Sequence, residues 1–305
     1  MEKAKKLSLG AKNFLLDIVR GVAIGVAFII PGFSGGSIAA ILGIYERLIG
    51  AIADIFKDFK NSVKTLFPVG LGMIIGVLSL LFPLSWALET FPIPTVSLFV
   101  GLAIGGIPSI TDRIKGKRIG FKNLIAMIIP ALVVLAISFM PIGADKNLTN
   151  LAFFGYVLLF LIGILGSSAL VVPGISGSML LLILGYYNPI VNLVTEHLLL
   201  GKDIGISILV LGITAVGIAV GFIGISAIMK FLLKSYPRAT YFAIIGFIVG
   251  SIPTIYVSTV KEAGMTFKTL PSSPMHWIAC VLLLLAGFFL SYLLVVYSRK
   301  FNEKD

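Results

Sequence analysis

The sequence is poor in the residues that build disulfides, metal centres and acid–base sites. Its 305 residues include one cysteine, Cys280, and two histidines, His197 and His276, and only 12% of them are charged. A single cysteine cannot form an internal disulfide. The two histidines stand in unrelated contexts, so no Cys/His cluster predicts a metal site. We therefore expect neither a metal ion nor a cofactor.

Negative charge is also scarce, with 13 acidic residues against 24 basic ones and a net charge of +11. Such a balance is found in nucleic-acid-binding proteins. Here, however, the basic residues lie between apolar segments and not in one patch with interleaved aromatic side chains, which argues against that class. Positive charge beside membrane spans sets topology and attracts anionic headgroups, so membrane lipids are the expected surroundings.

Apolar residues are what the chain has in excess: 58% of it is hydrophobic, and its mean hydropathy is +1.09. These values are typical of a polytopic membrane protein. Because every hydrophilic connection is short, we expect one transmembrane domain over 1–305. The apolar segments are 14–53, 66–88, 95–111, 123–141, 151–187, 205–229, 239–258 and 276–297.

Two of these segments are interrupted by the same short motif, 142 positions apart. The motif is Pro31-Gly32-Phe33-Ser34-Gly35-Gly36-Ser37 in the first copy and Pro173-Gly174-Ile175-Ser176-Gly177-Ser178 in the second. Proline and glycine break helices, and broken backbone in a membrane must find hydrogen-bond partners other than lipid. Breaks at matching places in two halves are the best indication in a sequence of a transporter's binding site.

The distribution of basic residues predicts the topology. If each broken segment enters and leaves on one side, then 20 of the 24 basic residues fall on one face, together with both chain ends. The positive-inside rule makes that face cytoplasmic. The first arm, 14–30, is about 25 Å long as a helix, which is shorter than the roughly 30 Å hydrocarbon core. A re-entrant hairpin is therefore favoured, although the charge count also allows two full spans.

The internal repeat extends beyond the motif and predicts an all-α, inverted-topology fold. Leu42-Gly43-Ile44-Tyr45 matches Leu184-Gly185-Tyr186-Tyr187, and matches continue at an offset of 145 from Phe91-Pro92 to Tyr236-Pro237. Each half, about 14–141 and 151–298, then consists of one re-entrant hairpin and three transmembrane helices. Three crossings place the second half upside down relative to the first.

The two hairpin tips are suited to binding an anion. Helix starts present free N–H groups and partial positive charge, glycine lets a ligand approach the backbone, and serine adds hydroxyl donors. The competing interpretation is a kink in which serine bonds to nearby carbonyls. The expected binding residues are Gly32, Ser34, Gly35, Gly36, Ser37, Gly174, Ser176, Gly177 and Ser178.

Three charged residues are candidates for gating or ion coupling. Glu46 follows the first motif, and Arg20 and Arg113 stand at predicted cytoplasmic span ends. For Glu46, the alternative is an interfacial pair with Arg47. For the arginines, the alternative is snorkelling to the membrane surface.

The paired motifs, each with a trailing Leu-Gly-x-Tyr, resemble those of the PopT-type polyprenyl-phosphate translocase family over nearly the whole chain. The resemblance implies a flippase that returns undecaprenyl phosphate from the outer to the inner leaflet of the cell membrane. Two positions depart from the family pattern. Thr is frequent where Ser37 stands, and many members carry an acidic residue where this chain has Phe28.

The functional hypothesis is therefore a transporter of a polyprenyl-phosphate lipid and not an enzyme. A small-anion channel or exchanger with the same helix-end site is the alternative. A lipid phosphatase would need a histidine beside an Arg- and Ser-bearing motif, which the sequence lacks. A proton or a sodium ion could serve as coupling ion. The sequence has no signal for an oligomeric state.

Overall fold

The computed structural model describes residues 2–29, 34–114, 120–198, 204–262, 264 and 273–302, all helical or connecting, with no strand among them. The first half contains α1 (Glu2–Ile29), α2 (Gly35–Ile41), α3 (Tyr45–Ala53), α4 (Phe59–Thr90), α5 (Pro92–Thr111) and α6 (Phe121–Phe139). The second contains α7 (Phe153–Val171), α8 (Gly177–Leu184), α9 (Tyr187–Asn192), α10 (Ile204–Ser235), α11 (Pro237–Glu262) and α12 (Pro274–Asn302). A short 3-10 turn, Asp112–Ile114, follows α5, and a π-helical turn, Leu193–Leu198, follows α9.

Seven of these helices are long and apolar enough to cross a membrane: α4, α5, α6, α7, α10, α11 and α12. They coincide with the predicted apolar segments, so the chain is an all-α, multi-pass membrane protein. Helix α4 begins at Phe59, earlier than predicted, because the Asp58 side chain accepts a hydrogen bond from the Asn61 amide and caps it. Helices α5 and α11 are the innermost spans, with 61% and 67% of their apolar windows buried, against 11% for α6.

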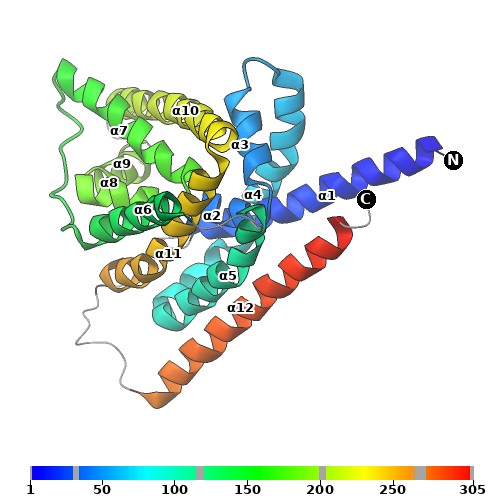
Figure 1. Cartoon of the computed structure of the whole chain (residues 1–305). Helices are drawn as coiled ribbons and strands as arrows, with labels where there is room; N and C mark the ends of the chain where they lie inside the picture. Colours follow the sequence, from blue (N-terminus) through cyan, green and yellow to red (C-terminus); the bar gives the residue numbers. More distant parts are fainter. Residues whose placement is uncertain are drawn as a thin grey trace.

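Corresponding helices of the two halves make corresponding contacts (Figure 1). Helix α1 packs along α4 as α7 packs along α10, while α5 packs on α12 as α11 packs on α6. Glycines allow these close approaches. A Cβ on Gly72 would lie 2.0 Å from the Ile18 carbonyl oxygen, and one on the matching Gly217 would lie 2.3 Å from the Phe160 carbonyl oxygen. The pattern agrees with the predicted repeat. The structure adds that the last helix of each half, α6 or α12, packs on the other half, which the sequence did not predict.

The turns of the repeat have the same geometry in both copies. Gly43 and Gly185 end α2 and α8 with left-handed φ angles of 69° and 76°. The amide of Gly43 donates to the Ala40 carbonyl, and that of Gly185 donates to the Leu182 carbonyl, at the matching position. The Leu-Gly-x-Tyr signal thus encodes one helix-ending turn, used twice, because glycine reaches this φ without steric cost.

The same correspondence holds at the α4–α5 and α10–α11 junctions. The Thr95 hydroxyl donates to the Ala87 and Phe91 carbonyls, and the Thr240 hydroxyl donates to the Leu232 and Tyr236 carbonyls. Pro92 and Pro237 follow these junctions as the first residues of α5 and α11, the helix position at which a missing N–H costs least.

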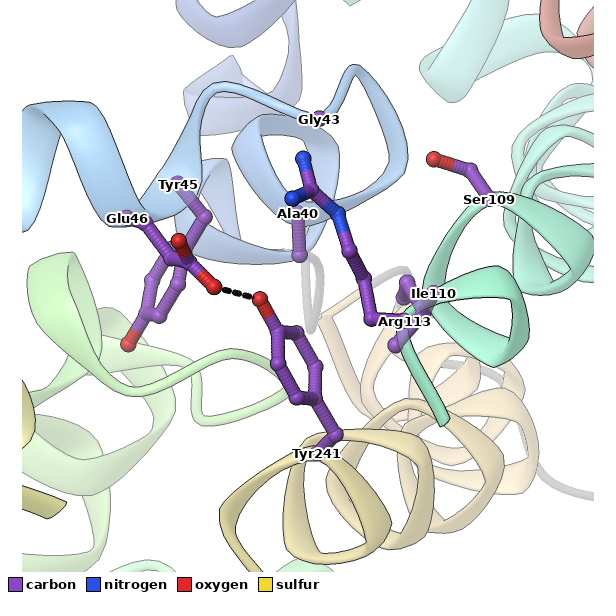
Figure 2. Close-up of a pocket in the computed structure, with 8 residues that line it drawn as sticks. All are labelled: Ala40, Gly43, Tyr45, Glu46, Ser109, Ile110, Arg113 and Tyr241. Atoms are coloured by element: carbon purple, nitrogen blue, oxygen red, sulfur yellow. Dashed lines mark hydrogen bonds between the residues drawn. The ribbon is translucent and has the colours of Figure 1, made fainter. Parts of the chain in front are cut away.

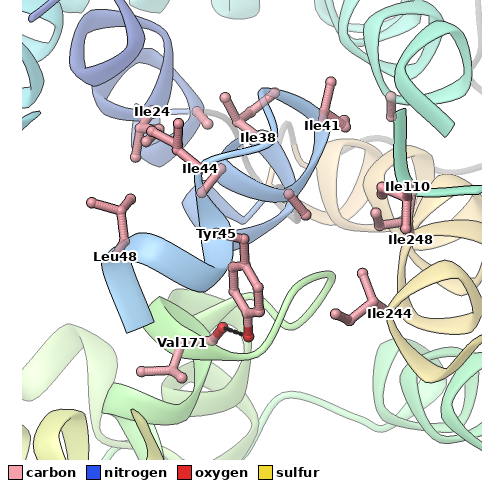
Figure 3. Close-up of a cluster of buried hydrophobic side chains, with 14 of the residues drawn as sticks. Ile24, Ile38, Ile41, Ile44, Tyr45, Leu48, Ile110, Val171, Ile244 and Ile248 are labelled. Atoms are coloured by element: carbon pink, nitrogen blue, oxygen red, sulfur yellow. Dashed lines mark hydrogen bonds between the residues drawn. The ribbon is translucent and has the colours of Figure 1, made fainter. Parts of the chain in front are cut away.

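The two hairpins have different surroundings despite their similar turns. All seven residues of α2 are buried, whereas only Met179 of α8 is buried. Ile38 and Ile41 of α2 belong to the main apolar core with Ile110 of α5 and Ile244 and Ile248 of α11 (Figure 3). The first hairpin is therefore enclosed at the centre of the protein, and the second is partly open.

Candidate functional site

Ser34 forms the start of α2 and joins the first motif to the second half of the chain. Its side chain accepts a hydrogen bond from the Gly36 amide at 3.2 Å, which caps the helix. Its hydroxyl donates to the Ala169 carbonyl oxygen of α7 at 3.0 Å. A Cβ on Gly36 would lie 3.1 Å from the Val171 carbonyl oxygen, so glycine allows this approach. Ser34 is 2% exposed.

Ser176 has the equivalent capping role in the second motif. Its side chain accepts from the Met179 amide at 3.4 Å, and its hydroxyl lies 3.1 Å from that of Ser178. Gly174 has a left-handed φ of 82°, and a Cβ there would lie 2.4 Å from the Phe247 carbonyl oxygen. The glycine is thus required both by the turn and by the contact with α11.

The first hairpin touches the end of α7, directly before the second motif. Besides the Ser34 bond, the buried Tyr45 hydroxyl donates to the Val171 carbonyl oxygen at 2.8 Å (Figure 3). That carbonyl lies at the end of α7, where the break leaves it without a helical partner. The expected site residues Ser34 and Gly36 are therefore brought against residues 169–173. Gly32 lies outside the described residues.

The expected site residues differ in accessibility. Ser34, Gly35, Gly36 and Ser37 are buried, whereas Ser176, Gly177 and Ser178 are partly exposed and Gly174 is buried. Ser37 is 0% exposed, and its hydroxyl has no hydrogen-bond partner among the described residues. The competing interpretation of the motif is accordingly realised at Ser34, whose hydroxyl bonds to carbonyls, and not at Ser37.

A charged recess lies where the first hairpin meets α5 and α11 (Figure 2). It has a cavity volume of about 10 Å³, about the room that one water molecule needs, and is lined by Ala40, Gly43, Tyr45, Glu46, Ser109, Ile110, Arg113 and Tyr241. The Tyr241 hydroxyl donates to the Glu46 carboxylate across this recess. Arg113 extends its guanidinium beside Ala40 and Gly43. Two of the three expected gating residues, Glu46 and Arg113, are thus brought together.

Arg20, the third expected gating residue, lies in a separate cluster. Its guanidinium binds the Asp17 carboxylate at 3.1 Å, and Arg47 binds the same carboxylate at 2.5 Å. Asp17 is 6% exposed, so the two arginines compensate a buried charge. Arg47 is therefore paired with α1, and Glu46 is paired with Tyr241, in place of the interfacial Glu46–Arg47 pair considered above.

Comparison with known proteins decides the family. A family model described as undecaprenyl phosphate translocase-like matches residues 24–269. The chain belongs to this family. A Vibrio cholerae protein named polyprenyl-phosphate transporter is 28% identical over 321 residues, covering 94% of this chain and 98% of that protein. A Staphylococcus aureus protein of the same name is 32% identical over 280 residues, covering 90% and 94%. No solved structure matches.

The family match covers α2, α8 and the charged recess, since all these residues lie within 24–269. Among the described residues, no group of three or more His, Cys, Asp and Glu side chains could hold a metal ion. Among the described residues of the two motifs and the recess, the groups that can donate to an anion are hydroxyls, backbone amides and the Arg113 guanidinium, and the recess also holds the Glu46 carboxylate.

Three residues that join the first hairpin to other segments were not predicted from the sequence to be site residues. Tyr241 was not singled out because a tyrosine in the first turn of an apolar helix looks interfacial. Tyr45 carried a usable signal as the last residue of the repeated Leu-Gly-x-Tyr motif. Asp54 had none, since its partner Lys230 is 176 positions away.

Proposed function

We propose that this protein translocates a polyprenyl monophosphate, undecaprenyl phosphate, from the outer to the inner leaflet of the cytoplasmic membrane for recycling of the carrier. The two motif tips bind the phosphate headgroup while the prenyl tail stays in lipid. The observation that carries the proposal is that Ser34 of the first Pro-Gly-x-Ser-Gly motif bonds to the end of α7, directly before the second motif, inside a multi-pass protein. The names of the curated relatives support the substrate class.

The physical task is to move a charged group through hydrocarbon. A bare phosphate loses its hydration there, at a cost of many kcal/mol. Hydroxyls of Ser37, Ser176 and Ser178 and the amides at both helix starts can replace part of that shell, and the Ser34 hydroxyl can join them once it leaves the Ala169 carbonyl. The tail needs no binding site of its own, because the outer surfaces of α4, α6, α10 and α12 are rich in exposed apolar side chains.

The unequal exposure of the tips supports an alternating cycle. In this conformation Ser176 and Ser178 are accessible, and Ser34 and Ser37 are enclosed. We propose that the headgroup meets the second tip first and passes to the first tip when the first hairpin moves. The first hairpin region is held to α11 by the Glu46–Tyr241 bond and to α10 by the Asp54–Lys230 pair. Both contacts must therefore open on the face that carries most of the basic residues.

The test is translocation of a fluorescent polyprenyl phosphate in proteoliposomes, followed by quenching from outside. Replacing one donor to a charged group costs about 1.5–3 kcal/mol, so Ser176→Ala should slow translocation about tenfold or more. Ser168→Ala is the matched control, because the Ser168 hydroxyl already bonds to Leu165 within α7. Equal rates for the two variants would contradict the proposal.

The same vesicles distinguish the small-anion alternative. Flux of inorganic phosphate or chloride without added lipid phosphate, together with no translocation of the fluorescent lipid, would favour a channel or exchanger. Lipid translocation without such flux would favour the flippase.

A further inference from the structure

The charged recess has no charged counterpart in the other half of the chain. The offset of 142 that relates the hairpins pairs Glu46 with Asn188, and the offset of 145 that relates α5 and α11 pairs Arg113 with Ser258. The same offset pairs Tyr241 with Val96. One end of the repeat therefore has a carboxylate, a guanidinium and a phenol where the other has an amide, a hydroxyl and an isopropyl group.

The counterparts are also engaged or enclosed. The Asn188 amide donates to the Asp145 carboxylate at 3.1 Å. Ser258 and Val96 are each 0% exposed. These counterparts include neither a cation nor an open recess, and Lys261, one turn after Ser258 in α11, already donates to the Ser138 carbonyl oxygen at 2.8 Å. The two ends of the molecule therefore offer a headgroup different chemistry.

Arg113, by contrast, is exposed and forms no hydrogen bond or ion pair with any other described residue. Its guanidinium reaches into the recess from the turn after α5, toward the end of α2 (Figure 2). Guanidinium groups bind phosphate oxygens through two parallel N–H donors. The Tyr241 hydroxyl and the Ser109 side chain line the same recess and add neutral donors.

We infer that this recess is a phosphate-binding station at the basic end of the protein only. The ligand is a phosphomonoester dianion, and Arg113 supplies the charge and Tyr241 a hydroxyl donor. The Glu46 carboxylate must leave, because it would repel the anion. Binding there exchanges the Tyr241–Glu46 hydrogen bond for a Tyr241–phosphate bond and so releases the first hairpin from α11. This inference rests on the proposed function.

The consequence is an unequal affinity on the two sides of the membrane. A station at one end does not change the equilibrium distribution of lipid between leaflets, which only coupling to another gradient can do. It does make the rates at which the headgroup binds and dissociates differ between the basic end and the opposite end.

The experiment measures binding of farnesyl phosphate to the full chain in nanodiscs of neutral lipid, with farnesol as the tail-only reference. Arg113→Gln should weaken farnesyl phosphate binding about tenfold to a hundredfold. Arg238→Gln removes the same charge from an exposed position in the first turn of α11, outside the recess, and should change binding less than about twofold. Arg113→Lys keeps the positive charge but loses the two parallel N–H donors of the guanidinium, so its loss of binding should be smaller than that of Arg113→Gln.

Two further arms identify the ligand and the mechanism. Competition by inorganic phosphate that depends on Arg113 would assign the recess to phosphate itself, and its absence would assign it to the lipid ester. Tyr241→Phe should also weaken binding. The thermal stability of Arg113→Gln should equal that of the wild-type protein, so that its loss of binding is not a loss of folding. Equal losses in Arg113→Gln and Arg238→Gln, or no loss in either, would overturn the inference.

The same variants separate this inference from the proposed function. Normal Arg113→Gln binding together with slow translocation by Ser176→Ala would remove the station and leave the flippase. Arg113-dependent phosphate binding in a chain that translocates no lipid phosphate would support the station and remove the flippase.

Discussion

At the scale of single residues, equivalent positions of the repeat share backbone geometry but not surroundings. Gly43 and Gly185 have nearly the same left-handed φ. Around Gly43 nothing lies within 4 Å of an added Cβ, whereas at Gly185 the Ala144 carbonyl oxygen would lie 2.1 Å from it. The local motif therefore sets the turn, and the contact is added by a loop that only one hairpin meets.

This difference predicts unequal effects of one substitution. Gly43→Ala should lower stability by about 1–2 kcal/mol, the cost of a left-handed alanine. Gly185→Ala should lower it further, because the Cβ also displaces the Ala144 carbonyl. Thermal unfolding of the purified protein in detergent measures both. Gly212→Ala, at a helical position with open space, is the control, and an equal loss in all three variants would contradict the prediction.

At the scale of elements, the first hairpin is held by hydrogen bonds to the broken end of α7. Tyr45 donates to Val171, and Ser34 donates to Ala169, across 126 and 135 positions. Helix breaks leave carbonyls that lipid cannot satisfy, so each hairpin tip needs partners from elsewhere in the protein. Here the second tip finds them in the first hairpin.

Tyr45→Phe should therefore weaken the contact between the first hairpin and the end of α7. The substitution leaves the buried Val171 carbonyl without this donor, at a cost of about 1–3 kcal/mol. Hydrogen exchange at residues 34–41 should increase in the variant. Tyr236→Phe, at an exposed tyrosine, supplies the control for loss of a phenolic hydroxyl. Unchanged exchange in Tyr45→Phe would mean that the contact contributes little.

Helix pairs depend on glycine at the points of closest approach. Gly72→Ala places a methyl group 2.0 Å from the Ile18 carbonyl oxygen, so α1 must move away from α4, at a cost of about 1–3 kcal/mol. Gly70→Ala in the same helix meets open space and should be neutral or slightly stabilising. The melting temperatures of the two variants compare these sites directly, and a larger loss at Gly70 would contradict the assigned packing.

At the scale of the whole molecule, side-chain contacts sort the connecting segments into two groups. Asp17–Arg47, Asp54–Lys230 and Glu46–Tyr241 join segments that the charge distribution places on one face. Asn188–Asp145 and the Lys261 bond to the Ser138 carbonyl at 2.8 Å join segments placed on the other. These contacts agree with the predicted topology, and the side on which each group lies stays a prediction.

Labelling of introduced cysteines tests that orientation. In a Cys280→Ala background, Lys57→Cys should react with an impermeant maleimide only in inverted vesicles. Lys146→Cys should react in intact cells, because it belongs to the other group. Both positions are exposed, so poor access cannot explain a negative result. Reaction of both from one side would overturn the topology.

The sequence predicted the spans, the two helix breaks, the repeat of the Leu-Gly-x-Tyr segment and the family. Each depends on local rules: apolar length, proline and glycine at breaks, and one turn motif. It did not predict that the Glu46 partner would be Tyr241, 195 positions away, or that α2 would be enclosed while α8 is partly open. Those outcomes depend on packing between segments distant in the chain.

The sequence by itself determined which segments cross the membrane and where two of them break, because lipid forces each backbone to satisfy its own hydrogen bonds. Only the tertiary structure decided which tip is enclosed, and that Glu46, Arg113 and Tyr241 share one recess. The reason is that side-chain partners are selected by packing, which brings together residues that no local pattern relates.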